Sequence, residues 1–140
     1  MIIVSACLAG IKCKYDGKDN AHEKIIELVR QGLAIPLCPE QLGGLSTPRS
    51  TSEITERNVV TFDGKDVTGN FQKGAEETLK IAKLINCQKA ILKQRSPSCG
   101  FGKIYDGTHS GKVVEGNGIT AELLHENGII ILTEEDFQTE

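Results

Sequence analysis

Four short runs of apolar residues divide the chain, and none of them alternates between apolar and polar positions. They are MIIVSA at 1–6, LAIPLC at 33–38, KAILK at 89–93 and GIIILT at 128–133. Continuous runs rich in Ile, Val and Leu are typical of strands that are buried on both faces, as in parallel sheets. The pattern therefore predicts a mainly parallel sheet of about four strands.

Segments with helical periodicity separate these runs. Those that place apolar or small side chains on one face are residues 20–31, 70–86 and 120–127. Asn20 and Glu23 form a capping pattern before the first helix, and Thr120 stands at the start of the third. Strands and helices that alternate in this order, joined by right-handed crossovers, predict a three-layer, doubly wound (Rossmann-like) α/β sandwich.

Two further segments do not fit the alternation. Residues 58–67 carry an Asp63-Gly64 pair between short apolar stretches, which predicts a hairpin or a tight turn. Residues 101–118 are rich in glycine and too polar for a core, so we expect a long loop there that contains a small hairpin.

Size and charge narrow the possible partners. A chain of 140 residues with 39% apolar content is typical of one globular domain, spanning 1–140. The net charge of -3, with acidic and basic residues interspersed, argues against long nucleic acid as the partner, whereas a small base or nucleoside stays compatible. The apolar start lacks a basic flank and is shorter than the roughly 20 residues of a membrane span. We therefore expect a cytoplasmic protein with no membrane contact.

The five cysteines are the main candidates for chemistry: Cys7, Cys13, Cys38, Cys87 and Cys99. An odd number of cysteines without a secretion signal makes a disulfide framework the poorer interpretation. Buried apolar residues, metal ligands and catalytic thiols are the alternatives in a reducing compartment.

Three of these cysteines follow predicted strands. Cys7, Cys38 and Cys99 end or follow the first three apolar runs, and the carboxyl ends of parallel strands meet at one edge of the sheet. We expect their sulfurs to lie close together. Cys87 falls at the opposite edge and is expected to be structural, whereas Cys13 shares a loop with Cys7 and its role stays open.

Three thiolates without an evident fourth partner suit soft metals. Either zinc with an open position or an iron-sulfur cluster with one free iron is compatible. His109, in the polar loop, is a candidate fourth ligand. The chain contains no CxxC pair, which argues against zinc ribbons and thioredoxin-like motifs.

Polar residues near the predicted thiol site are candidates for catalysis. Glu40 stands two residues after Cys38, and Ser96 stands three residues before Cys99. A carboxylate beside a metal is a candidate general acid or base, and the serine is a candidate hydrogen-bond donor. A solvated loop glutamate and a turn-forming serine are the alternatives. Candidate substrate contacts are Arg49, Arg95 and Ser98.

The segment GNGITA, residues 116–121, matches the pattern GxGxxA before a predicted helix. As a dinucleotide fingerprint it is weak, because it follows the third long strand and lacks the acidic residue expected after the next strand. A glycine-rich helix start can instead bind an anion or pack against the sheet edge.

Together the segments SACLAGIKCKYDG, CPEQLGGLSTPR, DVTGNF and AILKQRSPSCG occur in the order found in one bacterial family. The chain resembles this TudS-like thiouracil desulfidase family, formerly of unknown function, over essentially its whole length. The resemblance implies a [4Fe-4S] cluster on Cys7, Cys38 and Cys99, which air-handled protein can lose. It also implies a fourth iron free to take the sulfur of a thiolated base, with Glu40 and Ser96 as catalytic residues.

The activity implied by the resemblance is non-redox desulfuration of a thiolated nucleobase or nucleoside resembling 2-thiouracil. Water replaces the sulfur, and sulfide is released. Two alternatives from other classes stay open at this point. One is a metal or iron-sulfur binding protein without catalysis, and the other is a nucleotide-binding regulatory domain that uses residues 116–121.

Overall fold

A four-stranded parallel sheet forms the centre of the computed structural model, which describes residues 1–137. Its strand order is β2 (Ala34–Leu37), β1 (Ile2–Ser5), β5 (Lys89–Leu92) and β8 (Ile130–Thr133). All three strand pairs are parallel. The structure confirms the predicted sheet, and each strand falls inside one of the uninterrupted apolar runs.

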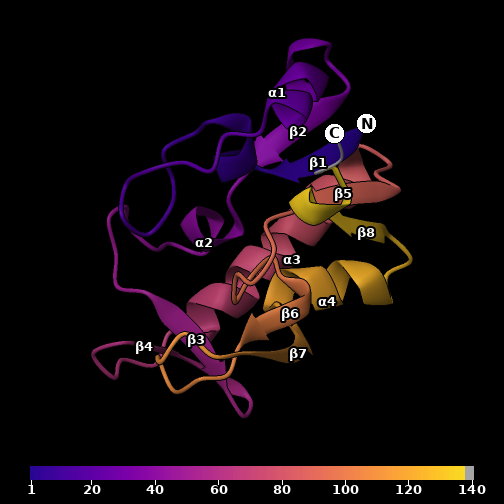
Figure 1. The fold of residues 1–140 in the computed structure, drawn as a ribbon. Helices are drawn as coiled ribbons and strands as arrows, with labels where there is room; N and C mark the ends of the chain where they lie inside the picture. Colours follow the sequence, from indigo (N-terminus) through magenta and orange to yellow (C-terminus); the bar gives the residue numbers. More distant parts are fainter. Residues whose placement is uncertain (138–140) are drawn as a thin grey trace.

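Helices cover both faces of this sheet (Figure 1). On one face α3 (Thr68–Leu84) and α4 (Ile119–Glu126) pack against each other, and on the other face lies α1 (Glu23–Arg30). Successive residues of a strand point to opposite faces. Accordingly, Ile3 joins the buried cluster on the side of α3 and α4, whereas Val4 packs with Ile25 of α1. The predicted three-layer α/β sandwich is confirmed.

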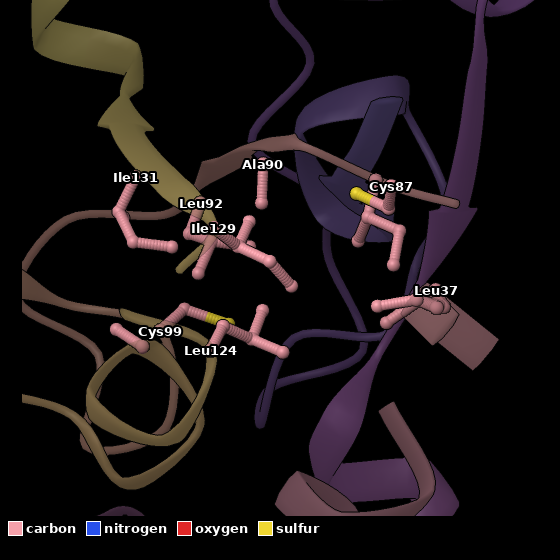
Figure 2. Close-up of a cluster of buried hydrophobic side chains, with 11 residues drawn as sticks. Leu37, Cys87, Ala90, Leu92, Cys99, Leu124, Ile129 and Ile131 are labelled. Atoms are coloured by element: carbon pink, nitrogen blue, oxygen red, sulfur yellow. The ribbon is translucent and has the colours of Figure 1, made fainter. Parts of the chain in front are cut away.

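The buried cluster on the side of α3 and α4 extends to the carboxyl edge of the sheet. Figure 2 shows its side chains, among them Leu92 of β5, Leu124 of α4 and the sulfur of Cys99. Cys99 is only 5% exposed, so the core fixes its position from one side.

No helix among residues 1–137 is long and apolar enough to cross a membrane.

The predicted helix starts were wrong in detail. Helix α1 begins at Glu23 after His22, and no side chain caps it, because the Asn20 side chain hydrogen bonds to the Cys7 thiol instead. Helix α4 begins after Gly118, and the hydroxyl of Thr120 lies inside the helix against Ser98, 2.8 Å away. Both polar side chains serve contacts that are distant in sequence rather than local caps.

Two antiparallel hairpins extend beyond the sheet (Figure 1). They are formed by β3 (Ser52–Thr55) with β4 (Asn58–Thr61) and by β6 (Phe101–Tyr105) with β7 (Val113–Asn117). The second is the small hairpin expected within 101–118. The Asp63-Gly64 pair forms a tight turn after β4, in which Gly64 N–H donates to the Thr61 carbonyl at 2.9 Å.

Three short helices were not predicted. They are the 3-10 helices η1 (Ala6–Ala9) and η2 (Glu134–Phe137) and the single-turn α2 (Pro39–Leu42). Helix α2 crosses α3 in direct backbone contact, since a Cβ atom at Gly74 would lie 2.0 Å from the Pro39 carbonyl oxygen. A Cβ atom at Gly43 would likewise lie 2.0 Å from the Asn70 carbonyl oxygen. Glycine at both positions allows α2 to sit this close to α3.

Candidate active site

A cavity of about 600 Å³ opens at the carboxyl edge of the sheet. After β1 the chain adds β2 on one side, and after β2 it returns to add β5 on the other side of β1. Ligands of open α/β sheets bind at such a switch point. The loops after β1, β2 and β5 form the floor of the cavity, and the β3–β4 and β6–β7 segments contribute its outer wall.

The three predicted ligand cysteines line this cavity together. Cys7 lies in η1 directly after β1, Cys38 follows β2, and Cys99 lies in the turn after β5. Cys13 also lines the cavity, whereas Cys87 is buried in the core and donates its thiol hydrogen to the Lys89 carbonyl, 3.1 Å away. The loop after η1 thus brings a fourth sulfur, Cys13, into contact with Cys38.

Each of the three sulfurs accepts a hydrogen bond from the protein. The Asn20 side chain donates to Cys7, the hydroxyl of Ser5 donates to Cys99, and the Gln41 backbone N–H and the Cys13 thiol both donate to Cys38. Each of these contacts favours the thiolate over the thiol. Hydrogen bonds to ligand sulfurs are among the outer-shell contacts that orient and tune metal sites, including iron-sulfur clusters.

Burial works against ionisation of the same thiols. Desolvation raises the pKa of Cys7, and it raises the pKa of Cys99 to about 12. The hydrogen bond from Cys13 lowers the pKa of Cys38 and raises the pKa of Cys13. Repulsion between thiolates raises the pKa of Cys7 and Cys99 further. A bound metal group would reverse this balance through its own positive charge.

The donor set fits a cluster of several metal atoms. Three soft sulfur ligands from three separate segments face one cavity, each with its own hydrogen-bond donor. Within residues 1–137 no three His, Cys, Asp or Glu side chains are placed to hold a single metal ion. His109 lies in the outer wall, where its Nδ1 is 3.7 Å from Glu53 and its ring packs edge-on against Phe62.

Glu40 lies in the first turn of α2 and lines the cavity, with its side chain 16% exposed. Its Oε1 accepts a hydrogen bond of 2.9 Å from Nε of Arg49. Burial raises the pKa of Glu40, and the charge and hydrogen bond of Arg49 oppose that rise. The carboxyl group therefore sits beside the thiols as a partly desolvated, fixed group rather than as a solvated loop residue.

Ser96 lines the same cavity, and its hydroxyl is oriented by the backbone. Its Oγ accepts hydrogen bonds from the backbone N–H groups of Ser98 and Cys99, each at 3.0 Å. A hydroxyl has two acceptor lone pairs and one hydrogen. With two N–H groups on its oxygen, Ser96 keeps its own hydrogen to donate.

Helix α4 holds the turn that carries Ser96 and Cys99. The N–H groups of Gly118, Ile119 and Thr120 donate to the carbonyls of Gly100, Pro97 and Ser98, at 2.7, 2.9 and 2.8 Å. A Cβ atom at Gly118 would lie 2.4 Å from the Ser98 carbonyl carbon. The GNGITA segment therefore packs against the sheet edge, and these N–H groups are occupied by the protein rather than left for an anion.

The three candidate substrate contacts differ in placement. Ser98 is 1% exposed, hydrogen bonds to Thr120 and is not among the described residues that line the cavity. Arg95 lies at the cavity wall and pairs with Glu135 at 3.3 Å. Arg49 lines the cavity but turns its guanidinium to Glu40.

Sequence reasoning missed several residues of this site. Asn20 and Ser5 carry hydrogen bonds to the sulfurs, yet Asn20 matched a helix-capping pattern and Ser5 lay inside a strand. Glu53 is 8% exposed and accepts the N–H groups of Gly107 and His109 at 3.0 and 3.1 Å. The signal for this contact in the sequence was an acidic residue within the β3 segment SEIT.

Three comparisons with known proteins cover nearly the whole chain. The model of the 2-thiouracil desulfurase family matches residues 2–136. The uncharacterized protein YbbK of Bacillus subtilis (strain 168) is 47% identical over 146 residues, covering 97% of each protein. The solved structure of the [4Fe-4S]-dependent thiouracil desulfidase TudS matches with a TM-score of 0.93 and 42% identity, covering 96% of this chain and 91% of that one.

Proposed function

Because the chain belongs to the 2-thiouracil desulfurase family, we propose that it is a [4Fe-4S]-dependent desulfidase of thiolated bases. In this reaction a thiocarbonyl and water become a carbonyl and hydrogen sulfide, with no net oxidation or reduction. One observation carries the proposal. Three thiols, a partly buried carboxyl group and a hydroxyl oriented to donate all line one cavity at the switch point of the sheet.

The ligands of the cluster are Cys7, Cys38 and Cys99. Their hydrogen bonds from Asn20, Gln41 N–H and Ser5 favour the thiolate state that metal binding needs. A cluster held by these three cysteines would supply Lewis acidity toward the sulfur of the substrate.

Glu40 acts as the general base. Its Oε1 is occupied by Arg49, and Oε2 is left to accept a proton from water as that water adds to the thiocarbonyl carbon. Ser96 acts as a hydrogen-bond donor, because the N–H groups of Ser98 and Cys99 occupy its oxygen and leave its own hydrogen for the substrate. Its O–H can stabilise the negative charge that develops on the groups bound to the tetrahedral carbon.

The substrate is a small thiolated base or nucleoside resembling 2-thiouracil. The cavity of about 600 Å³ falls in the range of ligand pockets, which is about 300–1,000 Å³. The wall that would face such a substrate includes the aromatic rings of Tyr15, Phe62 and Tyr105. A cytoplasmic location and the absence of a long nucleic-acid partner stay predictions.

The decisive experiment uses protein reconstituted with iron and sulfide under anaerobic conditions. Wild-type protein should bind about four iron atoms per chain, absorb visible light and release sulfide from 2-thiouracil while forming uracil. Glu40→Gln should keep the colour and lose sulfide release. Cys87→Ser, which removes a buried core thiol, is the matched control and should keep both.

Two outcomes would contradict the proposal. Protein that stays colourless after reconstitution would exclude the cluster, and with it the enzyme. Coloured protein that forms no uracil from any thiolated base would instead favour a non-catalytic iron-sulfur protein, for which Glu40→Gln would make no difference.

A further inference from the structure

Arg49 is the most enclosed cation of the site, with its side chain 9% exposed. Its guanidinium makes four hydrogen bonds within the protein. The acceptors are Glu40 Oε1 at 2.9 Å, Ser46 O at 3.1 Å, Thr47 Oγ1 at 2.9 Å and Cys13 O at 2.8 Å. A guanidinium has five N–H groups, so at most one is left for a ligand.

These acceptors belong to three different segments of the chain. Glu40 lies in α2, Ser46 and Thr47 lie in the turn before Arg49, and Cys13 lies in the loop after η1. The backbone N–H of Arg49 also donates to the Tyr15 carbonyl at 2.8 Å. Arg49 thus joins the loop that follows β1 to the helix that follows β2, beside the cavity.

The contact with Glu40 engages only one of its two carboxylate oxygens. Oε1 accepts from Arg49, which is the side chain that hydrogen bonds to Glu40 among the described residues, and Oε2 makes no such contact with it. Because Glu40 lines the cavity, a fixed Oε1 limits the positions that Oε2 can take there. The remaining N–H groups of the planar guanidinium are held by other acceptors, which fixes the direction of this single contact more narrowly than a point charge would.

We propose that Arg49 is a positioning residue that acts through Glu40, rather than a residue that binds the substrate. This inference rests on the proposed function and replaces the substrate contact that the sequence suggested for Arg49. Arg49 holds Oε1 so that Oε2 meets the water at the reacting carbon, and the bonds to Ser46, Thr47 and Cys13 keep the guanidinium itself from moving.

The two roles predict different kinetics. A displacement of about 1 Å at a catalytic group can cost about 100-fold in rate. Arg49→Gln should therefore lower kcat roughly 10- to 100-fold and leave KM within about 2-fold. Loss of a substrate contact would raise KM instead. Arg49→Lys should stay at least about 5-fold impaired in kcat, because lysine restores the charge but not the planar fork.

The experiment is a double-mutant cycle on cluster-loaded protein, comparing wild type, E40Q, R49Q and E40Q/R49Q. If Arg49 acts through Glu40, the double variant should have the same residual rate as E40Q within about 2-fold. A second readout is independent of turnover. The affinity of E40Q for 2-thiouracil, followed by the visible absorption of the cluster, should change less than about 2-fold when Arg49→Gln is added.

The matched control is Arg30→Gln, which removes an exposed arginine-glutamate pair, with Glu27 at 3.9 Å, away from the cavity. Its kcat should equal that of wild type. R49Q that matches wild type in kcat, or an E40Q/R49Q variant with affinity weakened more than about 10-fold, would overturn the proposal. Loss of the cluster in both R49Q and R49K would also overturn the proposal. Arg49 would then be needed to hold the loops that carry the cluster ligands, rather than to place Glu40.

Failure of the proposed function has a different signature. Wild-type protein would then bind the cluster but form no uracil. Failure of the inference about Arg49 alone leaves wild-type and R30Q proteins active, with R49Q equal to them or altered in substrate affinity.

Discussion

Gly74→Ala should displace α2, the helix that carries Glu40, the proposed general base. Gly74 lies in α3 where it crosses α2, and its added Cβ would lie 2.0 Å from the Pro39 carbonyl oxygen and 2.9 Å from the Pro39 carbonyl carbon. Real Cβ contacts essentially never fall under 3.0 Å, so the two backbones must separate by about 1 Å. No flexible side chain stands between them to absorb the change.

The stability cost follows from two opposing effects. Overpacking of a tight contact costs about 1–3 kcal/mol, and replacing glycine by alanine inside a helix returns up to about 1 kcal/mol. The net loss is then about 1–2 kcal/mol. For a chain of this size that loss lowers Tm by about 3–8 °C.

The effect on activity should exceed the effect on stability. Glu40 follows Pro39 in α2, so a helix pushed away from α3 moves the carboxyl group by a similar distance. A misplacement of about 1 Å predicts about a 100-fold loss of kcat. Cys38 occupies the N-cap position of α2, so the same displacement should weaken iron binding. The variant should still bind enough iron to absorb visible light.

Gly69→Ala is the matched control, because Gly69 lies in the same helix and a Cβ atom there would meet nothing within 4 Å. It should leave kcat unchanged and raise Tm slightly, through the higher helix propensity of alanine. Thermal unfolding followed by circular dichroism, together with the rate of sulfide release, measures both variants. If G74A matches G69A in Tm and kcat, the close helix contact does not position Glu40.

Three further changes test other contacts. Cys13→Ser should leave about four iron atoms per chain, and loss of the visible absorption would show that Cys13 is a ligand. Ser98→Ala leaves the hydroxyl of Thr120 buried without its partner at 2.8 Å and should cost about 1–3 kcal/mol in urea unfolding, so a loss below about 0.5 kcal/mol would refute this. Hydrogen bonds from Thr68 lower the pKa of Asp66 below its ordinary 3.8, so its ionised form stabilises the fold above that pH, and the contribution is lost as the pH falls through the lowered pKa. The Tm difference between wild type and Asp66→Asn should accordingly be largest well above pH 3.8 and shrink only as the pH falls below 3.8, and a difference independent of pH would contradict the assignment.

The parts of the fold that the sequence predicts are those where one physical requirement decides the residue types. Strands buried on both faces must be apolar throughout, so the four runs marked the sheet without ambiguity. Parallel pairing then places Cys7, Cys38 and Cys99 at one edge, because chain direction alone determines which end of each strand faces that edge. The meeting of the thiols needed no knowledge of side-chain conformation.

Side-chain partners that are distant in sequence could not be predicted in the same way. Asn20 fits a helix cap as well as it fits a hydrogen bond to a thiol, and only the fold decides between them. In the sequence Arg49 cannot be distinguished from a surface arginine, because its partners in α2 and in the loop at Cys13 are brought to it only by the fold. Several geometries satisfy such polar residues locally, so their roles depend on which segments the fold brings together.

The roles of the glycines near the site depend on the fold in the same way. Gly43 and Gly118 both make room for another part of the protein. Gly43 lets α2 rest on α3, and Gly118 lets the start of α4 rest on the turn of Ser96 and Cys99. Within that turn the Cys99 N–H donates to Ser96 Oγ at 3.0 Å, so the Ser96 hydroxyl cannot move independently of Cys99. In the proposed reaction this link would keep the Ser96 hydroxyl at a constant spacing from Cys99, the proposed cluster ligand, while the substrate enters and leaves.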